Sequence, residues 1–211
     1  MFDPTAARQT MVESQLRARG ISDNRVLVAM QRVPRHEFVP ENLREQAYED
    51  HPLPIGEGQT ISQPYMVALM LEALELSATD RVLEVGAGSG YATAVLAELV
   101  AEVFAIERRS ILAEGARGVL KALGCSNVQL VTGDGSEGLK EWAPYDAILV
   151  SAAALEIPSA LVGQLREGGR MIIPVGSPDS QRLELIRMIE GSPVISTRGD
   201  VRFVPLISGE N

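Results

Sequence analysis

Three glycines and a nearby glutamate form the part of the sequence with the clearest chemical character. Gly86, Gly88 and Gly90 follow an apolar run and precede a helical pattern. Glycines at such a strand-to-helix turn let the backbone approach a ligand closely. The third glycine comes one residue earlier than in the dinucleotide pattern G-x-G-x-x-G, and Glu84 lies two residues before Gly86. A carboxylate at this place suits an ammonium or sulfonium ligand better than a pyrophosphate. The alternative is a tight turn that binds nothing.

Two further carboxylates follow later apolar runs. Glu107 lies about 20 residues after Gly86, the spacing expected for a carboxylate that accepts both ribose hydroxyls. Asp134 stands in a Gly-Asp-Gly sequence, where it could accept a hydrogen bond from an adenine amino group. The alternatives are a solvated strand end for Glu107 and a Gly/Asp turn for Asp134. Together with the glycines, the carboxylates indicate an S-adenosylmethionine site rather than an NAD site.

Ser62 lies upstream of these residues, in the segment Thr60–Pro64 that has little charge. Ser62 or Gln63 stands where the N-cap of the next helix belongs, a role worth about 1 kcal/mol for a serine. Ser62 could instead present its hydroxyl to a ligand, and its position alone leaves both interpretations open.

Capping residues and apolar spacing predict a helical subdomain in residues 1–78. An irregular loop should interrupt this subdomain over 51–62, because two prolines and two glycines lie in that stretch. The predicted helices open at Asp3-Pro4, at Ser22 or Asp23, at Glu41 and at Pro64.

Strand and helix patterns alternate in residues 79–176, and a helix is expected from Pro158 to Gly168. Repeated βα units imply an α/β fold with a doubly wound, mostly parallel sheet, in which ligands bind beyond the carboxyl ends of the strands. The predicted strands are Arg81–Val85, Val103–Ile106, Val128–Val131, Asp146–Val150 and Arg170–Val175.

Residues 177–211 lack a helical pattern. Leu183–Ile189 and Val201–Leu206 are predicted strands, and the link between them is too short for a crossover helix. At least one of them should therefore pair antiparallel at an edge of the sheet. All three parts fit within one compact domain.

Composition narrows the class of protein. The chain has 211 residues, a net charge of −9 and one cysteine, Cys125. A single cysteine excludes an internal disulfide and a Cys-only zinc site, and favours a cytoplasmic location. The acidic balance argues against a broad nucleic-acid binder, and no apolar run has the length of a membrane helix. Neither His36 nor His51 has a partner at metal-ligand spacing, so no metal is expected.

Motifs along nearly the whole chain resemble those of the protein-L-isoaspartate O-methyltransferase family, in its bacterial form. The most specific are the Thr-Ile-Ser loop placed before the glycine turn and the Val-Pro-Leu tail. The matching segments are Arg32–Arg35, Phe38-Val39, Leu53–Gly56, Gly58–Pro64, Val82–Tyr91, Gly133–Gly135, Ala143–Ala147, Gly168-Gly169, Ile173–Gly176 and Arg202–Leu206.

The resemblance implies a class I methyltransferase fold and a repair activity. The methyl group would pass from S-adenosyl-L-methionine to the free carboxylate of L-isoaspartyl residues in damaged proteins, leaving S-adenosyl-L-homocysteine. It implies that Ser62 is the active-site serine. The cofactor would be held by Glu84, Gly86, Gly88, Gly90, Glu107, Asp134 and Gly135, and the substrate cleft lined by Thr60, Ile61, Val204, Pro205 and Leu206. The expected partners are isoaspartyl proteins and peptides, bound by a monomer without metal, nucleic acid or membrane.

Two other classes remain open. One is a methyltransferase for a small molecule or nucleic acid, since Gln63-Pro-Tyr65 faintly resembles the N/D-P-P-Y motif of amino-group methylases. That motif belongs after the fourth strand, where this chain has Ser151 and three alanines. The other is a non-catalytic protein that binds S-adenosylmethionine on the same fold.

Overall fold

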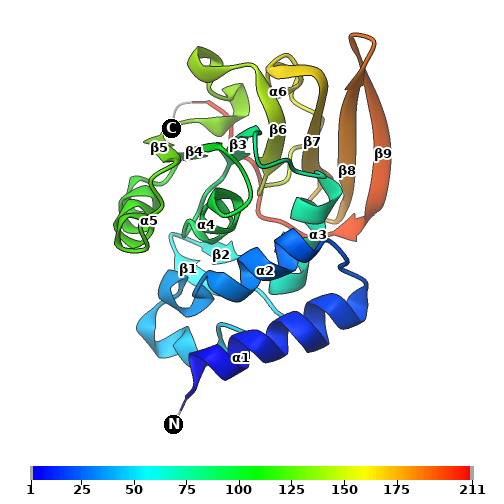
Figure 1. Cartoon of the computed structure of the whole chain (residues 1–211). Helices are drawn as coiled ribbons and strands as arrows, with labels where there is room; N and C mark the ends of the chain where they lie inside the picture. The colour runs from blue at the N-terminus through cyan, green and yellow to red at the C-terminus, as the bar shows by residue number, and fades with distance from the viewer. Residues whose placement is uncertain (1, 210–211) are drawn as a thin grey trace.

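A seven-stranded sheet organises the chain, and the computed structural model describes residues 2–209 of it. The strand order is β5-β4-β3-β6-β7-β8-β9, with all pairs parallel except the last two. This confirms the predicted sheet and its antiparallel edge (Figure 1). The strands are β3 (Arg81–Val85), β4 (Glu102–Glu107), β5 (Val128–Thr132), β6 (Tyr145–Val150), β7 (Leu165–Ser177), β8 (Ser180–Ile189) and β9 (Ser192–Val201).

The central strands are buried on both faces, because their successive apolar side chains point to opposite sides. Val82 and Val103 pack with the N-terminal helices, whereas Leu83 and Phe104 belong to the core of the other face. The first face is covered by α4 (Tyr91–Ala97), α5 (Ser110–Ala122) and the helices of residues 4–73. The helical part and the sheet therefore share one hydrophobic core.

The predicted helix from Pro158 to Gly168 is wrong in its length. The structure has only α6 (Ser159–Val162), and β7 already begins at Leu165. Leu165 pairs with Tyr145, and an irregularity follows before Arg170 pairs with Ala147. The residues from Leu165 onward therefore pair as a strand, although the local pattern predicted a helix there.

Most N-terminal helix boundaries follow the predicted caps. The Asp3 side chain accepts from the Thr5 and Ala6 amides at the start of α1 (Pro4–Thr10), which continues as π- and 3₁₀-helix to Arg19. Gly20 ends this helix in the left-handed conformation, with φ +98°. Asp23 caps α2 (Asn24–Arg32), and two 3₁₀ helices follow over Arg35–Phe38 and Glu41–Gln46.

The loop predicted over 51–62 contains an antiparallel hairpin. It is formed by β1 (Leu53–Gly56) and β2 (Gln59–Ile61), with φ +51° at Glu57 and +68° at Gly58 in the turn. A two-stranded ribbon tolerates Pro54 because each strand has a free edge that needs no N–H donor. The helix α3 (Pro64–Ala73) follows, with Gln63 at its N-cap position.

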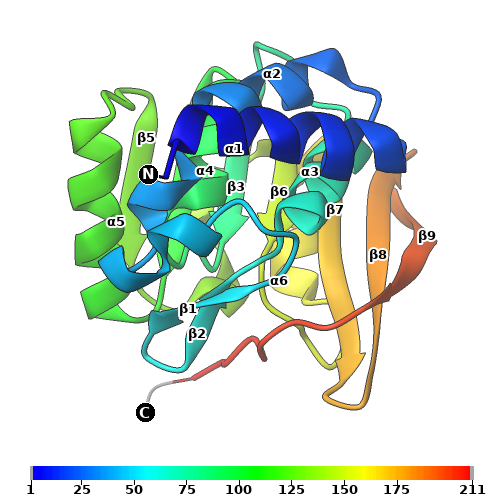
Figure 2. The same cartoon turned by 90° about the horizontal axis from the view of Figure 1, so that it is seen from below.

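The predicted strand Val201–Leu206 is wrong. β9 occupies Ser192–Val201, and all of its residues before Val201 are exposed, so no apolar alternation marks it in the sequence. The chain after β9 runs back across the sheet toward the β1–β2 hairpin (Figure 2). It is tied to Ala153, whose N–H donates to the Val204 carbonyl at 2.8 Å and whose carbonyl accepts from the Leu206 N–H at 2.7 Å.

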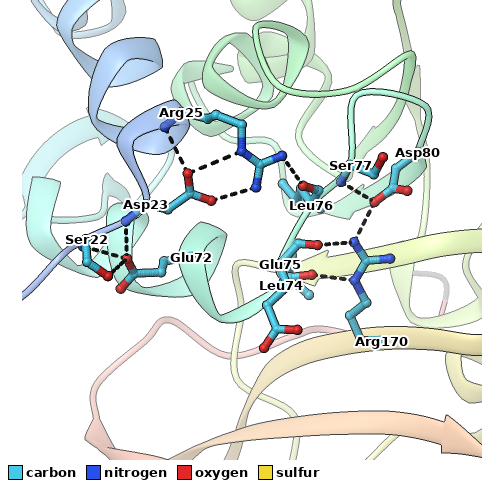
Figure 3. Close-up of polar contacts among 10 residues, drawn as sticks. All are labelled: Ser22, Asp23, Arg25, Glu72, Leu74, Glu75, Leu76, Ser77, Asp80 and Arg170. Atoms are coloured by element: carbon cyan, nitrogen blue, oxygen red, sulfur yellow. Dashed lines mark hydrogen bonds and ion pairs between the residues drawn. The ribbon is translucent and has the colours of Figure 1, made fainter.

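A cluster of polar contacts, buried around Arg170 and Asp80, fastens the end of α3 to the amino-terminal side of the sheet (Figure 3). The Arg170 guanidinium of β7 donates to the Leu74 carbonyl, to the Glu75 carbonyl at 2.8 Å and to Asp80 Oδ2 at 2.5 Å. Glu72 accepts from the Ser22 and Asp23 amides at 2.6 Å, which joins α3 to the start of α2. We call Arg170, Asp80 and the carbonyl groups that accept from Arg170 the base cluster.

Candidate active site

Three adjoining hollows lie at the carboxyl ends of the parallel strands. The inner hollow, about 490 Å³, lies beneath the glycine turn, and the outer hollow, about 630 Å³, lies between β4 and the C-terminal segment. An open cleft extends from them past Tyr65 and Phe203. Thr60 and Ser151 line all three hollows, so the three form one continuous site.

Glu84 is a fully buried carboxyl group in the wall of the inner hollow. Its Oε2 accepts from Thr93 Oγ1 at 2.5 Å, and within residues 2–209 its Oε1 has no hydrogen-bond partner. Burial raises the pKa of Glu84 to about 8, against the Thr93 hydrogen bond that lowers it, and the charge of Glu107 raises it further. An unpartnered buried oxygen in a hollow fits a cationic ligand group.

The predicted glycines have different roles. Gly86 and Gly88 line both the inner and the outer hollow, with φ +84° and +55°. Gly135 lines the outer hollow, and a Cβ atom on it would stand 2.5 Å from Val85 Cγ1. Gly90 lines none of the three hollows, and its bare Cα faces Ala116 of α5, 3.0 Å from where a Cβ would be. Gly90 therefore lets α4 and α5 approach each other.

Glu107 holds the glycine turn from the end of β4. Its Oε2 accepts from the Gly88 amide and its Oε1 from the Arg109 amide, both at 2.8 Å. Glu107 is 7% exposed and lines the outer hollow. Each carboxylate oxygen has a second lone pair, so both can also accept from a hydroxyl group.

Asp134 stands beside the outer hollow but is not among its lining residues. Its Oδ1 accepts from the Ser136 amide at 2.9 Å, and its Oδ2 accepts from the Gly209 amide at 2.7 Å. Arg108 also holds this end of the chain, by donating to the Gly209 carbonyl at 2.6 Å. The C-terminal segment therefore occupies an oxygen that the sequence analysis assigned to adenine.

Ser62 lies at the boundary between the inner hollow and the open cleft. The cap interpretation of Ser62 finds no support, because Gln63 is the N-cap residue of α3 and its side chain makes no capping hydrogen bond. The Ser62 carbonyl instead accepts from Arg35 Nη2 at 2.8 Å. Next in the chain, the Tyr65 amide donates to Asp50 at 3.3 Å, and Arg19 both pairs with Asp50 and lies over the Tyr65 ring.

The structure places Thr60, Ile61 and Val204–Leu206 around these hollows. Thr60 and Ile61 line the inner hollow, and the Val204–Leu206 segment lines the outer one. Sequence reasoning missed Arg19 and Arg35. The position of Ser151 after a predicted strand already indicated that it lines this crevice, and it lines all three hollows. Within residues 2–209, no cluster of His, Cys, Asp and Glu side chains could hold a metal ion, and no helix is long and apolar enough to cross a membrane.

The sheet order, the glycine turn and the carboxylates at the ends of β3 and β4 define a class I, S-adenosylmethionine-dependent methyltransferase. The sequence model of the protein-L-isoaspartate(D-aspartate) O-methyltransferase family matches residues 6–211. The chain belongs to this family.

Relatives agree over nearly the whole chain. The protein-L-isoaspartate O-methyltransferase of Methanoculleus marisnigri is 54% identical over 95% of this chain and 91% of its own length. That of Roseiflexus sp. is 57% identical over 96% and 92%. A crystal structure of a Plasmodium falciparum protein of this name, in complex with S-adenosyl-L-homocysteine, superposes with a TM-score of 0.84 at 31% identity, over 95% of this chain and 98% of that one.

Family membership carries the activity with it. The chain is an S-adenosylmethionine-dependent enzyme that methylates L-isoaspartyl residues of damaged proteins.

Proposed function

We propose that methyl transfer takes place where the inner hollow meets the open cleft, with Ser62 holding the substrate carboxylate. The observation that carries the proposal is the position of Ser62 on the boundary of both hollows, with its hydroxyl not used to cap α3. A hydroxyl can orient a carboxylate by donating to it without adding a repelling charge.

The residues around the two hollows fit S-adenosylmethionine. Glu84 would accept the ammonium group through its unpartnered Oε1, and Glu107 the ribose hydroxyls. The backbone of Gly86, Gly88 and Gly135 would line the bound cofactor, and Asp134 would accept from the adenine amino group in place of the Gly209 amide. When bound, this cofactor supplies an electrophilic methyl group and becomes S-adenosyl-L-homocysteine.

The chain's own contribution is alignment. An isoaspartyl carboxylate has a pKa near 4, so it is already ionised at neutral pH and needs neither a general base nor a metal ion. Holding its oxygen in line with the reacting methyl group replaces a bimolecular encounter with a prepared geometry. Ser62 and Thr60, at the junction of the hollows, are placed to hold that oxygen.

The C-terminal segment would hold the substrate main chain. The Val204 carbonyl and the Leu206 N–H are hydrogen-bonded to Ala153. The Pro205 carbonyl therefore faces the opposite side of this extended segment. A peptide pairing with this edge and with Thr60–Ile61 would be held by backbone hydrogen bonds, which ignore the flanking side chains. Broad sequence tolerance with a strict demand on the linkage follows from this arrangement.

The enzyme is proposed to act as a monomer on isoaspartyl proteins and peptides. The net charge of −9 disfavours nucleic acid and anionic membranes as partners, and a single cysteine suits the cytoplasm.

Paired peptides that differ only in the isoaspartyl or aspartyl linkage test this proposal. Both peptides carry one carboxylate, so charge cannot distinguish them. A misplacement of about 1 Å costs on the order of 100-fold in rate, so we expect kcat/KM to fall by about that factor for aspartyl peptides, in several sequence contexts. Comparable methylation of both linkages would indicate a general carboxyl methyltransferase instead.

A further inference from the structure

Arg35 is buried beside the active site without a carboxylate partner. Its side chain is fully buried, and no Asp or Glu of residues 2–209 forms an ion pair with it. Burial lowers the pKa of Arg35 to about 10, which leaves the guanidinium charged at neutral pH. The charge of Asp50 acts on the guanidinium without forming an ion pair with it. A buried charge without a directly paired carboxylate is costly, and an apolar side chain of similar volume would avoid that cost. Stability alone therefore gives no reason for an arginine at this position.

The contacts of Arg35 join three segments around Ser62. Arg35 Nε donates to the Ala47 carbonyl at 2.7 Å, and Nη2 donates to the Ser62 carbonyl at 2.8 Å. The guanidinium carbon lies 4.8 Å from the centroid of the Tyr91 ring, a cation–π distance. Tyr91 is the first residue of α4 and lines the inner hollow. One side chain thus connects the segment that carries Ser62 to α4, the helix that follows the glycine turn.

We propose that Arg35 is a positioning residue that fixes the backbone of Ser62, and through it the direction of the Ser62 hydroxyl, relative to the glycine turn. This inference rests on the proposed function of Ser62. A planar guanidinium can donate to two carbonyls and lie over a ring in one fixed arrangement. A lysine ammonium on its flexible stem cannot reproduce that arrangement. The Nη1 group of Arg35 and the hydroxyl of Tyr91 have no hydrogen-bond partner within the described residues, so the hydrogen bonds of Arg35 are those of Nε and Nη2.

The test is a double-mutant cycle of R35K and S62A, with R32K as the matched control. Arg32 lies in the same part of the chain, but it is exposed and pairs with Glu98. We expect R35K to lower kcat on an isoaspartyl peptide about tenfold and to leave the Kd for S-adenosyl-L-homocysteine within threefold. In the S62A background, R35K should lower kcat less than twofold, because the hydroxyl that it positions is gone.

Each other outcome has a distinct meaning. A normal kcat for S62A would refute the proposed function of Ser62 and this inference with it. A low kcat for S62A beside a normal kcat for R35K, or equal losses from R35K in both backgrounds, would refute this inference alone. R35Q, which keeps a planar N–H donor without the charge, guards against misfolding of R35K. Loss of native circular dichroism and of cofactor binding in both variants would make Arg35 a structural residue and overturn the proposal.

Discussion

Buried polar groups have hydrogen-bond partners at one end of the sheet and lack some of them at the other. In the base cluster, Arg170 donates to three backbone carbonyls and to Asp80, and neither side chain has a buried atom without a partner. At the carboxyl ends of the strands, Glu84 Oε1, Arg35 Nη1 and the Tyr91 hydroxyl are buried and unpartnered within residues 2–209. A satisfied network stabilises the fold, whereas an unsatisfied one leaves capacity for a ligand or for positioning. The following predictions test that division of roles.

The largest effect is expected from breaking the base cluster. Asp80→Asn leaves the buried Arg170 charge without its carboxylate, which costs about 3–5 kcal/mol of unfolding free energy. For a chain of this size that is a fall in Tm of roughly 6–20 °C. Thermal unfolding of Asp80→Asn and of the exposed control Asp179→Asn measures it, with kcat/KM at 25 °C expected within twofold of the parent. An unchanged Tm would show that this end is not where stability is concentrated.

Removal of the Ser62 hydroxyl should have the reverse signature. We expect Ser62→Ala to lower kcat about 10- to 100-fold, while Tm and the Kd for S-adenosyl-L-homocysteine change little, because an alignment contact is lost and no helix cap is. Steady-state kinetics with Ser14→Ala, an exposed helical serine, as the control would show it. A variant that melts earlier but turns over normally would restore the cap interpretation.

Glu107 should act on cofactor affinity. Each hydrogen bond to its charged carboxylate is worth about 1.5–3 kcal/mol, so Glu107→Ala should raise the Kd for S-adenosyl-L-homocysteine at least about tenfold. Part of the loss comes from the glycine turn, since the Gly88 amide loses its acceptor. Calorimetry beside Glu102→Gln, an exposed glutamate at the other end of β4, isolates the effect. Equal affinities for the parent and Glu107→Ala would remove Glu107 from the cofactor site.

Protonation of Glu84 should make cofactor binding depend on pH. With a pKa of about 8, the free carboxyl is mostly protonated at pH 6–7, and binding of an ammonium group requires the ionised form. Affinity for S-adenosyl-L-homocysteine should therefore rise about tenfold from pH 6 to pH 7, with release of about one proton.

Calorimetry in two buffers of different ionisation enthalpy counts that proton. Glu84→Gln should bind weakly and with no slope over the same range, because the ligand's own amino group stays protonated there. A parent enzyme whose affinity is equally flat would place the ammonium group elsewhere.

Local signals in the sequence brought the proposed cofactor residues to one edge of the sheet. Glu84 and Glu107 lie near the carboxyl ends of apolar strands, Gly86 and Gly88 follow one, and the carboxyl ends of parallel strands meet at one edge. The helix starts at Asp3 and Asp23 were equally accessible, since a cap bonds to amides two or three residues away.

Other features depended on pairing between distant residues. The β1–β2 hairpin and the exposed strand β9 carry no apolar alternation, so hydrophobic periodicity could not find them. The strand β7 displaced a predicted helix because Leu165 pairs with Tyr145. The hydrogen bond from the Gly209 amide to Asp134 joins residues that are 75 positions apart.

The sequence by itself determined the fold class, the glycine turn and the carboxylates around it, because helix caps, apolar periodicity and strand-end positions act over a few residues. Our proposals for Ser62 and Arg35, by contrast, depend on the tertiary structure. Ser62 could have been a cap until Gln63 was found in that place. Arg35 looks like an ordinary charged residue, and its burial rests on carbonyls 12 and 27 residues away. No local rule predicts such contacts, because they exist only once the chain has folded around the side chain.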